Sequence, residues 1–195
     1  MPERDEQGRI YNTAFVFGPD GKQLARHRKM HLFDIDVKGG QHFQESAVLT
    51  PGDSVTTFTA ELPSGPVTFG LAVCYDIRFP ELFRLMALKG AQVILVPAAF
   101  NMTTGPRHWE LLSRSQAVNN QVFIAGTAPA RNQSSSYISW GHSIITDPWG
   151  DVISQMDAVE DFRITEIDPG QISEVREQIP VLKHRRTDVY ELREL

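Results

Sequence analysis

Apolar and polar positions follow strand-like and helix-like patterns in alternating segments of the chain. Residues 67–73 (VTFGLAV) place large apolar side chains at odd positions and small ones at even positions, which predicts a strand packed heavily on one face. Residues 93–96 (VILV) form a continuous apolar run, as expected for a strand covered on both faces. Residues 122–127 predict another buried strand. These segments predict the buried sheet of an α/β fold.

Three helices are predicted beside this sheet. The first begins near Pro80, because proline is favoured in a first helical turn, and it ends at Gly90. The second spans residues 107–120, and a short third helix opens at residues 168–169. The side chains expected to point inward from the first and third helices are Leu82, Leu85, Met86, Ile172, Val175 and Ile179. The charged segment 183–195 is expected on the surface or on a partner subunit.

Two β-hairpins are predicted on either side of these elements. Residues 11–29 contain a run of strand formers, the turn sequence GPDG at 18–21 and a returning strand. Residues 143–153 repeat this arrangement around DPWG at 147–150. In both turns proline presets φ and glycine permits the exit of the chain.

The composition suits one globular domain over residues 1–195. Of the 195 residues, 41% are hydrophobic, which is enough for a sizeable core. The net charge of −5 disfavours nucleic acid as a partner, because like charges repel. No segment approaches the roughly 18 consecutive apolar residues of a membrane span, and residues 1–9 (MPERDEQGR) lack the apolar region of a signal peptide. We therefore expect no membrane association and a cytoplasmic location.

Metal and cofactor sites are not expected either. Cys74 is the only cysteine, so the chain can form neither an intramolecular disulfide nor a cysteine cluster for zinc. His27 and His31 are four residues apart, but their segment is predicted as strand and loop. The helical spacing of metal ligands therefore does not apply to them.

Cys74 is a candidate nucleophile, although a lone cysteine at the end of a strand is most often a small buried hydrophobe. It lies where a strong strand stops and a helix is about to begin, at the carboxyl end of the sheet, where α/β folds bind ligands. The coming helix N-terminus offers free N–H groups that stabilise a thiolate and an oxyanion. The residues that follow, 75–81, are polar where a core segment would stay apolar.

Amide hydrolysis by such a thiol also needs a donor for the charge of the tetrahedral intermediate and a proton for the leaving amine. Lys29 is the candidate, because it ends a strand and precedes a loop entry that mixes apolar and polar groups. A surface lysine is the ordinary interpretation of such a residue, and only the resemblance described next favours a catalytic role. For Arg26 and Arg28 we expect a solvated strand face.

Two motifs, in this order and at this wide spacing, resemble the nitrilase superfamily of carbon–nitrogen hydrolases. Residues 27–34 (HRKMHLFD) are similar to its lysine motif, and residues 73–81 (VCYDIRFPE) are similar to its nucleophile motif. Residues 99–110 (AFNMTTGPRHWE) resemble the omega-amidase branch, and residues 137–143 (YISWGHS) and 147–150 extend the match. The resemblance covers nearly the whole chain.

The resemblance implies a nitrilase-type α-β-β-α sandwich and a Glu-Lys-Cys triad. Matched motif by motif, Cys74 is the nucleophile, Lys29 is the cation at the tetrahedral centre, and the backbone N–H of Tyr75 completes the oxyanion site. Glu45 matches a second glutamate that the family places near the lysine, where it would orient Lys29 or help in proton transfer. By itself Glu45 would be interpreted as a loop carboxylate exposed to water.

The implied activity is hydrolysis of the ω-amide of small dicarboxylic acid monoamides, α-ketoglutaramate and α-ketosuccinamate, through an acyl-enzyme with release of ammonia. The free carboxylate of such a substrate needs a cationic or hydroxyl-rich partner. The candidates for substrate binding are Arg78, Phe100, Thr103 and Thr104. Arg78 could equally brace the turn after Cys74 through an ion pair. The family also implies a homodimer, with a small-molecule amide as the other partner.

The sequence departs from the family pattern at the general base. The family's first glutamate lies well upstream of the lysine motif, whereas only 28 residues precede Lys29 here, and Glu3 and Glu6 lack the expected strand and loop context. We therefore expect an N-terminally truncated domain, as in a fragment, a shortened gene model or a misplaced start. A chain without the base should hydrolyse amides poorly, and a mitochondrial form stays open.

Other functions also stay open. Deaminated-glutathione amidases, carbamoylases and nitrilases share the triad, and their substrates depend on the shape of the pocket. A non-catalytic pseudoenzyme or interaction module on the same fold would carry these motifs too. A redox-sensing thiol is disfavoured, since the chain has no second cysteine that would resolve it.

Overall fold

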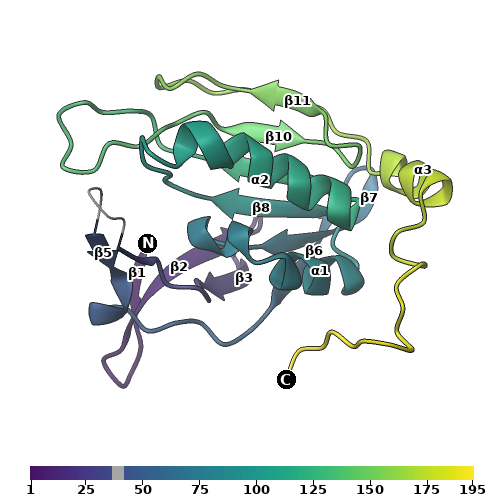
Figure 1. Ribbon diagram of the computed structural model, residues 1–195, viewed down its shortest axis with the longest axis horizontal. Helices are drawn as coiled ribbons and strands as arrows, with labels where there is room; N and C mark the ends of the chain where they lie inside the picture. Colours follow the sequence, from purple (N-terminus) through teal and green to yellow (C-terminus); the bar gives the residue numbers. More distant parts are fainter. Residues whose placement is uncertain (37–41) are drawn as a thin grey trace.

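A six-stranded sheet forms the centre of the computed structural model, which describes residues 1–36 and 42–195 (Figure 1). Its strands, in spatial order, are β11 (Val152–Gln155), β10 (Ile144–Thr146), β9 (Phe123–Thr127), β8 (Val93–Pro97), β7 (Gly65–Leu71) and β6 (Thr56–Leu62). β7, β8 and β9 pair in parallel, and the flanking strands pair antiparallel. The predicted buried strands and the later hairpin are thereby confirmed.

The central strands are buried on both faces, as the apolar run at 93–96 predicts. Ile94 and Val96 belong to a large core cluster on one face, whereas Val93 belongs to a smaller cluster on the other. On the first face a Cβ added to Gly70 would lie 2.7 Å from the sulfur of Met86. Glycine at this position therefore lets the helix that carries Met86 pack closely on the sheet.

Helices α1 (Pro80–Leu88) and α2 (Gly105–Asn120) lie side by side over that face (Figure 1). The predicted start of α1 is right, and α2 begins two residues earlier than predicted. Leu82 and Met86 are buried as expected, but Leu85 is only partly buried and Phe83 is fully buried. The buried side chains of α1 are therefore Leu82, Phe83, Met86 and Ala87, and Phe83 takes the place predicted for Leu85.

Helix α3 (Gly170–Gln178) contributes Ile172 to the smaller cluster, and Val175 is buried beside it. The prediction for Ile179 was wrong, because its side chain is 49% exposed. The helix ends at Gln178, and Ile179 has φ −132° and ψ 84°, which directs its side chain away from the helical face.

The residues before β6 form two smaller sheets. Their strands are β1 (Pro2–Arg4), β2 (Ile10–Phe17) and β3 (Gln23–Arg28) in the first sheet, and β4 (Asp34–Asp36) and β5 (His42–Gln44) in the second. The β2–β3 hairpin confirms the prediction for residues 11–29. β3 also packs against β6. The chain therefore leaves β3 beside the six-stranded sheet, and Lys29 is the first residue after that strand.

Arg28 is not on a solvated strand face as predicted. Its guanidinium donates to both carboxylate oxygens of Glu3, at 3.1 and 2.6 Å, and lies 3.8 Å above the ring of Tyr11. Arg26 is the more exposed of the two arginines, and it donates to Glu3 at 3.0 Å. The hydrogen bond from Arg28 lowers the pKa of Glu3 to about 2, so Glu3 is a structural anion.

The segment 183–195 lies on the surface, which is one of the two predicted placements. Glu194 holds its end, because this carboxylate accepts a hydrogen bond from the backbone N–H of Val55 at 2.9 Å and pairs with Lys89 at 2.6 Å.

Among the helices of the described residues, none combines the length and apolar character needed to cross a bilayer.

Candidate active site

Cys74 occupies a strained turn between strand and helix. β7 ends at Leu71, and Cys74 begins the short 3₁₀ helix η2 (Cys74–Arg78) with φ 49°, in the left-handed region that non-glycine residues seldom adopt. Its side chain is half-buried, and Sγ lies 3.9 Å from the carbonyl oxygen of Ala99. The turn therefore places the thiol at the carboxyl end of the sheet, as the sequence predicts.

Cys74 and Lys29 line one cavity of about 720 Å³. Glu45 lines the same cavity, so the three predicted members of the catalytic site come together although up to 45 residues separate them. Most of the other lining residues are apolar, and the full set is Met1, Asn12, Thr13, Ala14, Phe15, Phe17, Phe33, Phe43, Val73, Pro97, Ala98, Ala99, Thr127, Ala128, Pro129 and Tyr137. A pocket of this size accommodates a small organic molecule.

The ammonium of Lys29 is almost fully buried and is held by Glu45. Lys29 is 2% exposed, and its Nζ pairs with Oε2 of Glu45, which also accepts the backbone N–H of Phe33 at 2.7 Å. The backbone of Lys29 is fixed on both sides, because its N–H donates to Asn12 and its carbonyl accepts from Gly52, both at 2.8 Å. A buried ammonium requires such an ionic partner. The interpretation of Glu45 as a carboxylate exposed to water does not apply.

The thiol of Cys74 is protonated in this environment. Burial raises its pKa, and the nearby charge of Lys29 opposes the shift without cancelling it. The start of the following helix was expected to stabilise a thiolate, but η2 has only five residues, and burial still raises the pKa of Cys74 above its ordinary value. A base must therefore take the proton from Cys74 before the sulfur can attack.

Asp76 is a fully buried carboxylate two residues after Cys74, and no role for it was predicted from the sequence. Its carboxylate is fully buried and accepts bonds from the backbone N–H of Val73 at 2.9 Å and from that of His31 at 3.0 Å. Nε2 of His27 lies 3.1 Å from Oδ2, and Nδ1 of His31 lies 2.8 Å from Oδ1. The sequence contains a hint of this arrangement, because a buried aspartate is almost always paired. The two histidines that flank Lys29 are available as its partners.

Arg78 lies among aromatic rings and lines a second, smaller hollow next to Cys74. Its guanidinium lies 5.2 Å from the ring centre of Phe100 and 5.7 Å from that of Tyr75, and Nη1 lies 3.1 Å from Nδ1 of His108. Burial lowers the pKa of Arg78. Within residues 1–36 and 42–195 it forms no salt bridge, so the alternative in which Arg78 braces the turn after Cys74 through an ion pair is not supported.

The two predicted threonines are placed differently. Thr104 lines a small hollow together with Cys74, Arg78 and Phe100, and its hydroxyl donates to Oδ1 of Asn101 at 2.9 Å. Thr103 is exposed and lines neither this hollow nor the large cavity. The carboxamide of Asn101 also accepts the backbone N–H groups of both threonines, which turns Thr103 outward at the start of α2.

Tyr137 is a second residue of the site without a role in the sequence analysis. It lines both hollows, and its hydroxyl donates to the carbonyl oxygen of Ala99 at 2.7 Å, the same oxygen that Cys74 approaches. Burial raises the pKa of Tyr137 to about 12, so the phenol stays neutral and keeps its proton for hydrogen bonding.

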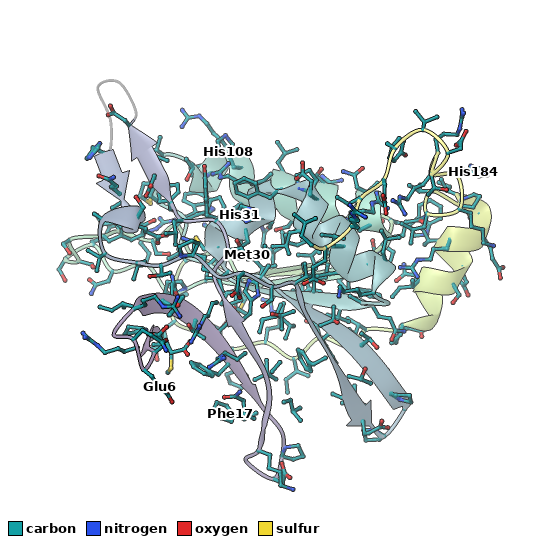
Figure 2. The ribbon with its side chains drawn as sticks, turned by 90° about the horizontal axis from the view of Figure 1, so that it is seen from below. Glu6, Phe17, Met30, His31, His108 and His184 are labelled. Atoms are coloured by element: carbon teal, nitrogen blue, oxygen red, sulfur yellow. The ribbon has the colours of Figure 1, made fainter. Side chains whose placement is uncertain are left out.

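The upstream glutamates lie away from Cys74. Glu3 is tied to Arg28, as described above, and Glu6 is exposed. Figure 2 shows Glu6 on the outer side of the β1–β3 sheet, away from His31 near the centre of the molecule.

In the described part of the chain, no three His, Cys, Asp or Glu side chains form a group that could hold a metal.

Comparison with known proteins assigns this chain to a family. A family model described as carbon-nitrogen hydrolase matches residues 1–177. The chain belongs to the carbon-nitrogen hydrolase family. It is 51% identical to omega-amidase NIT2 of Mus musculus over 190 residues, covering 97% of this chain and 67% of that protein. With omega-amidase NIT2 of Xenopus tropicalis the identity is 52%, over 100% of this chain and 68% of the relative.

Solved structures confirm the nitrilase-type α/β fold. Saccharomyces cerevisiae Nit3, a member of branch 10 of the nitrilase superfamily, superposes with a TM-score of 0.84 at 44% identity and covers 95% of this chain. The NitFhit protein of C. elegans gives a TM-score of 0.86 at 36% identity over 97% of this chain. This carbon-nitrogen hydrolase chain spans 64% and 46% of those two chains, respectively. The nitrilase superfamily and a likeness to omega-amidases are therefore established for it.

Proposed function

We propose that the chain carries the nucleophile and the cationic group of a thiol-dependent amidase that hydrolyses ω-amides of small dicarboxylic acid monoamides. The observation that carries the proposal is the shared cavity of Cys74 and Lys29. A buried ammonium beside a thiol suits acyl transfer, because it stabilises the oxyanion that forms when sulfur adds to an amide carbonyl. Similarity to omega-amidases supports the choice of amide, and α-ketoglutaramate and α-ketosuccinamate are the proposed substrates.

The proposed reaction has two steps. The sulfur of Cys74 adds to the amide carbonyl, while Nζ of Lys29 and the N–H of Tyr75 hold the oxyanion. The C–N bond then breaks, the nitrogen takes the proton that left the thiol, and ammonia leaves a thioester on Cys74. Water adds to the thioester, the C–S bond breaks, and the dicarboxylic acid and the thiol are regenerated. In both steps Glu45 orients Lys29 or relays a proton to it.

A carboxylate base must assist both steps, because the pKa of Cys74 is raised. Within the described residues Glu45 is already engaged by Lys29 and by the N–H of Phe33, and Glu3 is engaged by Arg28. We therefore propose that residues 1–195 alone turn over amides weakly. A base added to the cavity from a preceding region would restore the reaction.

The substrate carboxylate is proposed to bind at Arg78. This guanidinium lies beside Cys74, forms no salt bridge within the described chain, and lines the small hollow with Phe100 and Thr104. That hollow is only about 10 Å³, so the substrate carboxylate would reach Arg78 only when the side chains around the hollow move apart. We also propose a homodimer and a cytoplasmic location, which light scattering and cell fractionation would test.

The decisive experiment uses a chimera. The region of the mouse relative that precedes its matched segment is placed ahead of residue 1, and ammonia release is measured with α-ketoglutaramate, α-ketosuccinamate, deaminated glutathione, an N-carbamoyl amino acid and a nitrile. We expect turnover of the first two, and loss of at least about 10³-fold in Cys74→Ala, because the acyl-enzyme no longer forms. An active C74A chimera, or a preference for another substrate, would contradict the proposal.

A non-catalytic interaction module is the second candidate. The observation behind it is that Glu45 is already engaged by Lys29 and by the N–H of Phe33, while burial raises the pKa of Cys74. If the chimera and the 195-residue chain both fail to release ammonia, while both fold, this alternative becomes the better interpretation.

A further inference from the structure

Two chain segments carry the proposed catalytic groups, and one buried carboxylate joins them. Lys29 belongs to the segment after β3, and Cys74 belongs to the turn after β7. The carboxylate of Asp76 accepts a hydrogen bond from the backbone N–H of Val73, the residue before Cys74. The same carboxylate contacts His27 and His31, the residues two positions before and two positions after Lys29.

The carboxylate of Asp76 is held on both oxygens. Oδ2 contacts Val73 and His27, and Oδ1 contacts His31 through both its backbone and its ring. The ring of His31 is also stacked on Phe79 at 3.6 Å with an interplanar angle of 7°, next to the first residue of α1. Figure 2 shows His31 near the centre of the molecule. A fully buried anion with four contacts leaves little freedom to either segment.

We propose that Asp76 is a positioning residue whose buried carboxylate clamps the Lys29 segment onto the Cys74 turn and thereby sets the distance between ammonium and thiol. The inference rests on the proposed amidase function for its importance in catalysis, but the clamp itself can be tested without turnover. Hydrogen bonds to the ionised carboxylate outweigh its burial and lower the pKa of Asp76 to about 2, so the clamp is charged at all physiological pH values.

Asp76→Asn is the informative substitution, because it keeps the shape of the side chain. The carboxamide has one acceptor oxygen where the carboxylate has two, so the N–H of Val73 or the donors of His31 lose their partner. A matched control is Asp147→Asn. Asp147 is likewise buried, accepts backbone N–H groups of Trp149 and Asp151 at 2.9 Å, and lies in the β10–β11 turn outside the cavity.

The test is a double-mutant cycle read by alkylation of Cys74 with iodoacetamide as a function of pH. Lys29→Met removes the ammonium, so in the parent chain it should move the pH midpoint of alkylation upward. In the D76N background the same K29M change should have little effect, because the ammonium is no longer held near the sulfur. In the D147N background the full effect of K29M should persist. An unchanged effect of K29M in D76N would overturn the clamp.

Turnover of the chimera supplies the second readout. D76N should lower kcat by about 10²-fold with KM changed only a few-fold, since small displacements of reacting groups have effects of that size, whereas D147N should leave both parameters near the parent values. D76N kinetics equal to those of the parent would overturn the inference. If no form releases ammonia but D76N abolishes the K29M effect on alkylation, the positioning role stands and the proposed function fails.

His31→Ala keeps the inference testable if D76N does not fold, as judged by circular dichroism. The substitution removes the 2.8 Å ring contact and the stacking on Phe79, but it leaves the contacts of Asp76 to Val73 and His27. A reduced K29M effect in H31A is the expected result. A K29M effect of parental size in H31A would count against the clamp.

Discussion

The reactivity of Cys74 depends on two opposing effects on a single side chain. Burial disfavours the thiolate and raises the pKa of the thiol, whereas the charge of Lys29 favours the thiolate and lowers it. Burial is the larger effect, so the thiol keeps its proton up to a higher pH than a free cysteine does. The strained backbone at Cys74, with φ 49°, fixes the sulfur in the cavity rather than activating it.

The first prediction concerns the pH profile of this thiol. We expect the rate of Cys74 alkylation in the 195-residue chain to keep rising above pH 9, because the thiolate forms only above the raised pKa. At pH 7 the chain should react more slowly than a free cysteine. Mass spectrometry of the carbamidomethylated chain measures the rate. A plateau below pH 8 would show that the thiol is activated and would contradict the prediction.

Asp76 leads to a second prediction at the same scale. Its pKa is about 2 in the folded chain and 3.8 ordinarily, so the unfolded chain binds the proton first as the pH falls. The stabilisation from the ionised carboxylate is therefore complete above about pH 4 and is lost as the pH falls towards 2, with a size of about 2 kcal/mol. Urea unfolding at several pH values measures it. D76N should be less stable than the parent at pH 6, and the difference should shrink by roughly two thirds of this amount at pH 2.5.

At the scale of elements, local patterns predicted most of the fold. The strands at 93–96 and 122–127 and the start of α1 follow from periodicity and from proline, which act within a few residues. The burial of Phe83 in place of Leu85 was not predictable, because it depends on how α1 is rotated about its axis against the sheet. Arg28 was misplaced for a similar reason, since its partner Glu3 lies 25 residues away.

Gly52 supports a prediction about the element that carries Lys29. A Cβ at Gly52 would lie 2.0 Å from the backbone oxygen of Arg28, and the N–H of Gly52 donates to the carbonyl of Lys29. Gly52→Ala must therefore push the end of β3 away, and we expect a loss of at least about 1–3 kcal/mol in the free energy of unfolding. Thermal and urea unfolding would measure it.

Gly8→Ala is the matched control for this change. Gly8 has φ 81° with open space around its Cβ position, so alanine there meets backbone strain of about 1–2 kcal/mol but no clash. The two variants should also differ in the cavity, where only G52A should displace Lys29 and raise the pH needed for Cys74 alkylation. Equal behaviour of G52A and G8A in that assay would contradict the argument.

At the scale of the whole molecule, the site exists only where the β1–β3 sheet meets the six-stranded sheet. The motifs placed Cys74 and Lys29 correctly at the ends of β7 and β3, but the contact between the two segments had no local signal. Periodicity reports which face of a strand is buried, not which distant side chain it meets. No role was therefore predicted for Asp76, although the motif that contains it was recognised. Thr103 was predicted to bind substrate, but the turn at Asn101 directs it outward.

Docking of the two sheets gives the last prediction. Thr56 on β6 contacts Nδ1 of His27 on β3 at 2.9 Å, and His27 is fully buried. Thr56→Val keeps the side-chain shape but leaves Nδ1 of His27 without this partner, which should reduce the free energy of unfolding by about 1–3 kcal/mol. Thr59→Val is the control, because Thr59 is exposed on the same strand and its hydroxyl lies 3.1 Å from that of Thr68, and its effect should stay below about 0.5 kcal/mol. Because His27 also contacts Asp76, T56V should weaken the influence of Lys29 on Cys74 alkylation, whereas T59V should leave it intact. If T56V lowers stability but leaves that influence unchanged, the two sheets are held at the site by contacts other than the one through His27.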